Sequence, residues 1–193
     1  NPFGGICTLA CCKPKIRKGA KIGDWVVGVG GTKNKLVGRV IYAMVVEEAL
    51  TFRENWDDPR FQFKKPFLEG GHKGFFGDNI YRWDEDEDKY FQSNSHHSNA
   101  DGSTSFHNLK KDTDADRVLI SSNYVYFGQD AVLPPGDIAQ NYGDDFPHPV
   151  RDIYRSYPAE LEAKVKEWLT DSFEWGFRGL PAAWENAIEG KRA

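Results

Sequence analysis

Two apolar runs near the N-terminus set the expected architecture. Residues 24–29 and 36–46 are apolar at most positions, and a short polar turn, 32–35, separates them. A run that is apolar at successive positions is typical of a strand buried on both faces, in a covered sheet or a barrel. Because the connection is short, we expect the two strands to pair antiparallel.

Further along, the pattern predicts three shorter strands, at 79–83, 117–121 and 124–127. Between them, Pro59 interrupts any helix in the polar and aromatic stretch 54–65. The segment 93–116 has few apolar residues and is too long for an idle connection in a compact domain, so we expect a functional or mobile loop there.

The C-terminal part changes to a helical period. Pro158 suits a first helical turn, and glycines at 176 and 179 end the pattern before a short second helix, 181–188. The apolar positions between them recur at helical spacing; they are Leu161, Val165, Trp168, Leu169 and Phe173.

The elements together predict an α+β fold: a mostly antiparallel PUA-like β-barrel with a C-terminal amphipathic helix. With 193 residues and 39% hydrophobic content, the chain can bury a sizeable core. We expect one domain over 1–150 and a helical extension, 151–193, packed on it.

The net charge and the cysteine content limit which partners the protein is expected to bind and in which cellular compartment it is expected to be found. The net charge of -4 argues against bulk adhesion to nucleic acid, although a basic cluster is present at Lys13, Lys15, Arg17, Lys18 and Lys21. No apolar run approaches the roughly 20 residues that span a bilayer, so we expect no membrane partner. Three cysteines, an odd number clustered at one end, indicate a reducing compartment and a cytoplasmic protein.

The stretch GDWVVGVGG, residues 23–31, allows two interpretations. It can be a hairpin edge in which glycines turn the chain. Alternatively, small residues keep the backbone near a ligand while Trp25 forms the wall of a pocket, which suits a planar heterocycle. The glycines do not form a phosphate-binding motif, since neither GxGxxG nor GK[ST] is present.

The histidines of the polar segment also have more than one interpretation. His96, His97 and His107 lie near Asp101 and Asp112. Their side chains can hydrogen-bond within the loop, or one histidine can donate to a base or phosphate. The spacing of nine residues between His97 and His107 fits no standard zinc pattern, so we predict no metal and no cofactor.

Two other short motifs carry chemistry. Asp78 and Asn79 either cap the turn into a strand or present an acceptor and an amide to the edge of a base. Cys11 and Cys12 stand beside Lys13, and a nearby cation favours a thiolate. A thiol nucleophile also needs a base, which must come from far along the chain, so we interpret the cysteines as packed apolar residues.

Several ordered motifs carry a family resemblance: NPFGGICTLACCKPKIRKGAKIGDWVVGVGG, GRVIYAMVVEEALTF, WDDPRF, GDNIY, HHSNADG and VLISSNYVYFG. Over Pro2 to Pro135 the chain resembles the nucleotide modification-associated domain families, found in phages and bacteria alongside enzymes that make hypermodified DNA bases. A second resemblance concerns the fold alone. The strand pair is similar to PUA-like barrels of the EVE and ASCH kind, which implies binding of nucleic acid or modified bases, with Trp25 as a wall and residues 3–5 near it.

The first hypothesis is a module that binds a nucleotide or modified base, free or within DNA. Trp25 or Tyr81 stacks on the base, and the base edge is read by Asp78, Asn79 and His97, with His107 as a further ligand contact. Phosphates are met by Lys13, Lys15 and Arg17.

Two alternatives stay open. A transferase or hydrolase acting on a nucleotide or modified base would use His97 or His107 as general acid or base, oriented by Asp78 or Asp112. A scaffold subunit of a modification complex would bind a protein partner through its Trp-rich C-terminal tail. The resemblance assigns no catalytic residue, so whether the protein is an enzyme stays open.

Overall fold

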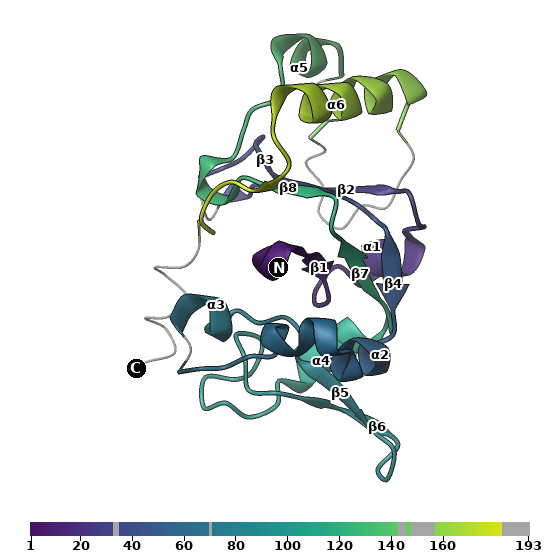
Figure 1. Ribbon diagram of the computed structural model, residues 1–193, viewed down its shortest axis with the longest axis vertical. Coiled ribbons are helices and arrows are strands. Elements are labelled where there is room, and N and C mark those ends of the chain that lie inside the picture. The colour runs from purple at the N-terminus through teal and green to yellow at the C-terminus, as the bar shows by residue number, and fades with distance from the viewer. Residues whose placement is uncertain (33–34, 70, 143–145, 148–156, 183–193) are drawn as a thin grey trace.

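A computed structural model describes residues 1–32, 35–69, 71–142, 146–147 and 157–182 (Figure 1). Within these ranges, no helix is long and apolar enough to cross a bilayer.

The centre of the fold is one long, bent antiparallel ladder. Strand β3 (Val40–Val45) leads into β4 (Glu48–Leu50), and β7 (Val118–Ser121) leads into β8 (Tyr124–Tyr126). β3 pairs with β8 and β4 pairs with β7, and the register is the same on both sides of the bend. The two runs therefore act as a pair of long strands that bend together.

The remaining strands add to this ladder or stand apart from it. β2 (Trp25–Val29) pairs antiparallel with β3, as the sequence predicted, and β1 (Cys7–Leu9) pairs with β7. β9 (Gly176–Phe177) adds in parallel to β8, and β5 (Tyr81–Asp84) forms a separate hairpin with β6 (Lys89–Gln92).

The predicted barrel is wrong for the part of the chain that the structure describes. The strands form three sheets, with orders β1-β7-β4, β2-β3-β8-β9 and β5-β6, and no closure is detected. The bend at Val46 and Glu47 divides the long ladder into short pieces of three to six residues. A barrel needs strands that tilt and stagger continuously around an axis, which these short pieces do not supply.

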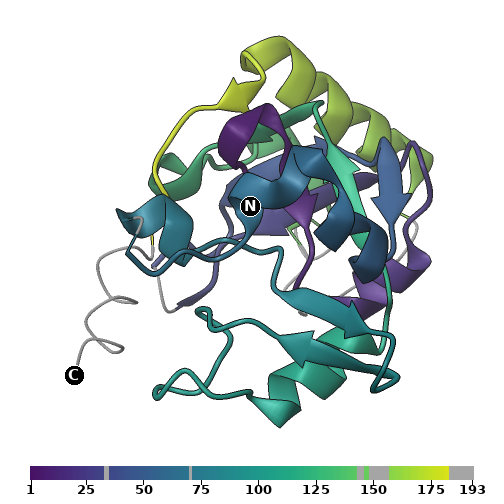
Figure 2. The same cartoon turned by 60° about the horizontal axis from the view of Figure 1, so that its bottom comes forward.

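Helices cover both ends of the ladder. Figure 1 shows α5 and α6 at one end and α2, α3 and α4 with the β5–β6 hairpin at the other, and in Figure 2 α6 again lies on the opposite side of the molecule from α4 and the hairpin. The bounds are η1 Phe3–Gly5, α1 Pro14–Gly19, α2 Phe52–Asp57, η3 Pro59–Lys64, α3 Gly71–Phe75, α4 Phe106–Thr113, η4 Gly128–Asp130, α5 Gly136–Tyr142 and α6 Ala159–Ser172.

Two helices lie in mostly polar stretches of the chain, and one of them corrects the expectation of a loop. α2 begins with a capping box, in which Glu54 N donates to Thr51 Oγ1 at 3.1 Å and Thr51 N donates to Glu54 Oε2 at 2.8 Å. It ends before Pro59, which starts η3. α4 lies inside the segment expected to be a loop, and Ser105 caps its first turn.

The core lies on both faces of the β2–β3 pair, as its continuous apolar pattern indicated. On one face, Val40 and Ala43 pack with Leu161 and Leu169 of α6. On the other face, Met44 packs among residues of β1 and β7. The predicted amphipathic helix is confirmed as α6, with Leu161, Val165 and Leu169 buried; most of the predicted second helix, 181–188, lies outside the described residues.

Candidate active site

A sharp turn after β1 carries the two adjacent cysteines. Cys12 and Lys13 both have left-handed backbone, with φ of 59° and 50°, and Pro14 then begins α1. This turn redirects the chain from the sheet into the helix and leaves both thiols half-buried.

A second segment brings imidazole to the same place. The loop that holds His97 follows β6, and hydrogen bonds to its backbone fix its position. The His97 carbonyl accepts from Asn108 Nδ2 at 2.8 Å and from Gln92 Nε2 at 3.3 Å. The His97 N–H donates to Ser95 Oγ at 3.2 Å. The loop therefore hydrogen-bonds within itself, as one sequence interpretation proposed, and also presents its histidine to the cysteines.

Three side chains line up as thiol, imidazole and carboxylate. Cys12 Sγ lies 3.5 Å from His97 Nε2, and His97 Nδ1 lies 3.0 Å from Asp112 Oδ2. The His97 side chain is 13% exposed and the Asp112 side chain 2%. Since the carboxylate accepts from Nδ1–H, the imidazole turns Nε2 toward the sulfur. This is the arrangement by which a base activates a nucleophile and a third group orients the base.

Buried groups hold Asp112 in position. The Tyr81 hydroxyl donates to Asp112 Oδ2 at 2.7 Å, and the Cys12 backbone N–H donates to Oδ1 at 2.9 Å. The carboxylate thus bridges α4, the hairpin strand β5 and the turn that carries the nucleophile candidate.

The environment shifts the ionisation of all three groups. Burial lowers the pKa of His97, but the hydrogen bond with Asp112 and the contact with Cys12 outweigh it and raise the pKa to about 9. Burial raises the pKa of Asp112, whereas its hydrogen bonds with His97 and Tyr81 bring it below its usual value. The hydrogen bond with Cys11 raises the pKa of the Cys12 thiol, and His97 offsets this in part. At pH 7 the neutral imidazole that can accept the Cys12 proton is therefore the minor form.

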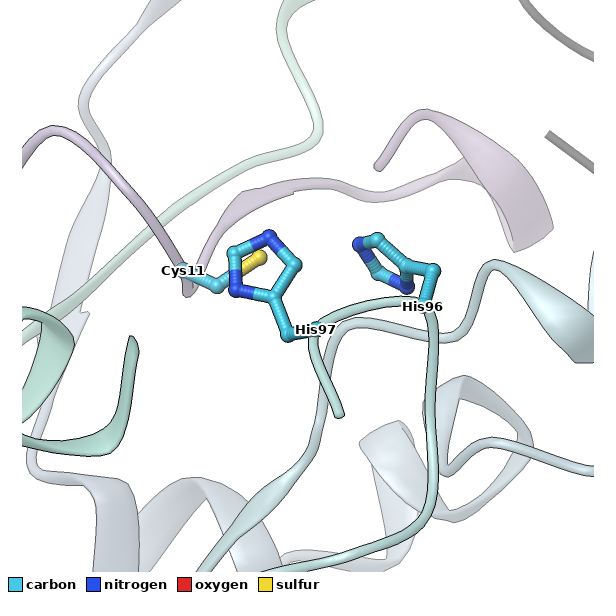
Figure 3. A group of neighbouring side chains, drawn as sticks. All are labelled: Cys11, His96 and His97. Atoms are coloured by element: carbon cyan, nitrogen blue, oxygen red, sulfur yellow. The ribbon is translucent and has the colours of Figure 1, made fainter. Parts of the chain in front are cut away.

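Donor atoms for a metal ion also meet here. Ligand atoms of Cys11, His96 and His97 all lie within 4.8 Å of one another, as do those of Cys12, His97 and Asp112. Figure 3 shows the Cys11 sulfur beside the His97 ring, with the His96 ring across from it.

Other residues expected to contact a ligand serve the fold. Arg17 is fully buried and donates to four backbone carbonyl groups, so no phosphate can reach its guanidinium. Asp78 is buried and accepts from Thr8 Oγ1 at 2.6 Å, and Asn79 Nδ2 donates to the Asn55 carbonyl at 2.9 Å. Neither side chain is open to a base edge.

The other expected contacts lie apart from one another. The Tyr81 ring is buried edge-on against Phe52 at 5.1 Å, so it cannot stack on a base. His107 is exposed on α4, and Lys13 is half-buried directly after Cys12. Of the predicted ligand residues, only His97 belongs to the thiol–imidazole–carboxylate row, and Tyr81 supports it.

Trp25 borders a separate cavity of about 230 Å³. Its walls come from α1, the start of β2 and the inner face of α6, and include Ile16, Leu161 and Lys166. Trp25 packs edge-on against Trp175 at 5.2 Å, and the Lys166 ammonium lies 5.9 Å from the Trp25 ring centre. The cavity therefore has an aromatic wall and a cation at its edge.

The part of the site that the sequence analysis missed is Cys12. The sequence contained one usable signal, a cysteine followed by basic residues and proline. No residue close to Cys12 in the sequence, however, could act as the base that a thiol nucleophile needs. His97 lies 85 positions further along the sequence, and the fold brings it to the thiol.

Comparison with known proteins identifies the family. The chain matches the model described as nucleotide modification associated domain 2 over residues 1–188, so it belongs to that family, as the resemblance implied. No curated protein and no solved structure matches the chain.

Proposed function

We propose that this protein is a thiol-dependent transferase or hydrolase that acts on a nucleotide or modified base. Cys12 is the nucleophile, His97 is the general acid and base, and Asp112 orients the imidazole. The observation that supports this is the row of contacts from Cys12 Sγ through His97 to Asp112. Membership of a nucleotide modification family supports the substrate class.

The chemistry that suits this row is acyl transfer. His97 Nε2 takes the thiol proton while Cys12 Sγ attacks the carbonyl carbon of an amide or ester. The carbon–heteroatom bond then breaks, and the leaving amine or alcohol takes the proton from the imidazolium. Water or an acceptor amine next attacks the thioester carbon, His97 removes the proton of the attacking group, and Cys12 Sγ leaves as the thiol. Water as acceptor gives hydrolysis, and a nucleotide amine as acceptor gives transfer.

The test is acylation by a simple ester, p-nitrophenyl acetate, at a pH near 9, where neutral His97 is well populated. We expect p-nitrophenol release with acetyl on Cys12, located by peptide mass spectrometry. His97→Gln should slow acetylation at least tenfold, in the range by which positioned acid–base groups act. His107→Gln, which changes an exposed histidine on α4, is the matched control and should leave the rate unchanged.

Two results would contradict the assignment. Acetylation spread evenly over Cys7, Cys11 and Cys12 would show no selective activation. An unchanged rate in His97→Gln, with folding confirmed by circular dichroism, would remove the histidine from the reaction.

A second candidate function is recognition of a nucleotide or modified base at Trp25. The cavity beside Trp25 supports it, because it encloses about 230 Å³ and one wall is an aromatic side chain on which a base can stack. A base within duplex DNA would have to flip out to enter, at a cost of a few kcal/mol.

The scaffold alternative has less support. It expects an exposed apolar face on the C-terminal helix, but Leu161, Val165 and Leu169 of α6 are buried in the core.

The three cysteines are free thiols, which supports a protein of a reducing compartment such as the cytoplasm.

A further inference from the structure

We propose that Cys11, His96 and His97 form a binding site for a divalent metal ion of borderline softness, for which Zn²⁺ is the test ion. Their spacing along the chain does not indicate such a site, because the two histidines are adjacent and the cysteine lies 85 residues before the first of them. The fold brings together one thiolate donor and two imidazole donors, which is a ligand set that zinc accepts.

The three donors are close enough to share one ion. Their ligand atoms lie within 4.8 Å of one another, and tetrahedral zinc with bonds of about 2.0–2.3 Å brings its ligands to within about 3–4 Å of each other. Rotations of the half-buried side chains that move the donor atoms by about 1 Å would close this difference. The rings of His96 and His97 already face each other edge-on, with centres 4.6 Å apart.

A second shell of hydrogen bonds supports His97 as a ligand. Metal-binding histidines commonly donate their other ring N–H to a carboxylate, which fixes the tautomer. Asp112 has this role toward His97 Nδ1 at 3.0 Å, so Nε2 is the nitrogen that faces the thiols. Tyr81 and the Cys12 backbone hold the carboxylate in turn.

The alternative set of Cys12, His97 and Asp112 is a poorer site. The Asp112 oxygens already accept from Tyr81, from the Cys12 N–H and from His97 Nδ1. Ligation by Asp112 would therefore break hydrogen bonds that position the site, whereas ligation by Cys11 and His96 keeps them. Three protein ligands leave a fourth position open, as in catalytic zinc sites.

Metal binding would also regulate the thiol, and this part of the inference rests on the proposed function. His97 Nε2 faces Cys12 Sγ at 3.5 Å. The same lone pair cannot both bind an ion and accept the Cys12 proton. An ion at Cys11, His96 and His97 therefore switches off acylation of Cys12.

The binding test uses Co²⁺ as a spectroscopic probe, with the protein kept reduced. We expect one equivalent to give a thiolate-to-cobalt charge-transfer band and intense tetrahedral d–d bands, and Zn²⁺ to displace the cobalt. Cys11→Ser and His96→Gln should each weaken binding at least tenfold. His107→Gln, which changes an exposed histidine of α4, is the control that should bind as the wild type does. Cys12→Ser distinguishes the two ligand sets, because it removes a ligand from the alternative set alone.

An octahedral cobalt spectrum without a thiolate band would overturn the site, as would unchanged binding in folded Cys11→Ser and His96→Gln. The regulatory part has its own readout: Zn²⁺ should block acetylation of Cys12 in the wild type but not in His96→Gln. If Cys12 is not acetylated even without metal, the proposed function fails, and the cobalt spectrum still decides the metal site.

Discussion

Arg17 shows how a single residue joins the two halves of the candidate site. Its guanidinium donates to the carbonyl of Cys12 at 2.9 Å and to the carbonyls of Asp112 and Ala115 at 2.5 Å. Burial lowers the pKa of Arg17, and the nearby Asp112 opposes that shift. The residue thus connects the turn that carries the thiol to the C-terminal end of the helix that carries the carboxylate.

We expect Arg17→Met to lower the free energy of unfolding by about 3 kcal/mol or more, because it leaves several buried carbonyl groups without donors. Urea unfolding followed by circular dichroism measures this. Lys15→Met, on the exposed side of α1, should change stability by less than about 0.5 kcal/mol. A stable Arg17→Met protein that binds DNA more weakly would return Arg17 to the phosphate-binding role expected from the basic cluster.

At the residue scale, the sequence indicates which side chains suit acid–base chemistry better than it indicates which of them lie in contact. His97 and Asp112 were both candidates for acid–base chemistry, and they do lie together. Cys12 was set aside because its base had to come from a distant segment, and no local pattern encodes a contact across 85 residues. The burial of Arg17 was equally hidden, since a run of lysine and arginine has the same appearance whether a member points outward or inward.

At the scale of elements, the bend in the central ladder has its own polar clamp. The Glu47 carboxylate at the bend accepts from the N–H and hydroxyl of Ser122 at 2.6 and 2.8 Å, and from Asn123 N at 3.3 Å. Burial raises the pKa of Glu47, but these hydrogen bonds outweigh it and lower the pKa below its usual value. The clamp holds the β7–β8 turn against the β3–β4 turn.

We expect Glu47→Gln to reduce the free energy of unfolding at pH 7 by up to about 1 kcal/mol, a small value because the carboxylate is exposed to solvent. A lowered folded-state pKa stabilises the protein above the unfolded-state pKa and ceases to do so as the pH falls through the folded-state value. The difference between the variant and the wild type should therefore shrink and disappear as the pH falls through the lowered folded-state pKa of Glu47. Glu167→Gln on exposed α6 is the control, and a difference that stays constant as the pH falls would show that the charge is not its cause.

Helices and strands were predicted correctly where the local pattern of apolar residues was strong, and were missed where it was weak. Apolar runs predicted β2 and β3, shorter apolar stretches predicted β5, β7 and β8, and helical spacing predicted α6. The strands β1 and β4 have three residues each and directly adjoin other segments, so no separate period marks them. The helices α2 and α4 are mostly polar, and their caps at Thr51 and Ser105 were the signals that could have located them.

At the scale of the whole molecule, the sequence could not predict whether the strands close into a barrel. Antiparallel strands buried on both faces are compatible with a barrel and also with open sheets covered by helices. Here α5 and α6 cover one face of β2–β3, and β1 with β7 covers the other. The cavity beside Trp25 is a product of this arrangement, because α1, β2 and α6 meet around it from distant parts of the chain.

That cavity makes base recognition testable on the intact protein. A ligand that binds only the folded state stabilises it by about 2.7 kcal/mol at a concentration of 100 times Kd, which raises Tm by roughly 5–11 °C in a chain of this size. We expect this shift with at least one nucleotide or modified nucleoside. Trp25→Leu should abolish it, and Lys166→Met should reduce it while sparing the core. Because neither Cys12 nor His97 lines the cavity, acetylation of Cys12 in both variants should match the wild type and show that they are folded. A shift that survives in Trp25→Leu would place the base elsewhere, and the absence of any shift across the panel would leave the cavity without a nucleotide ligand.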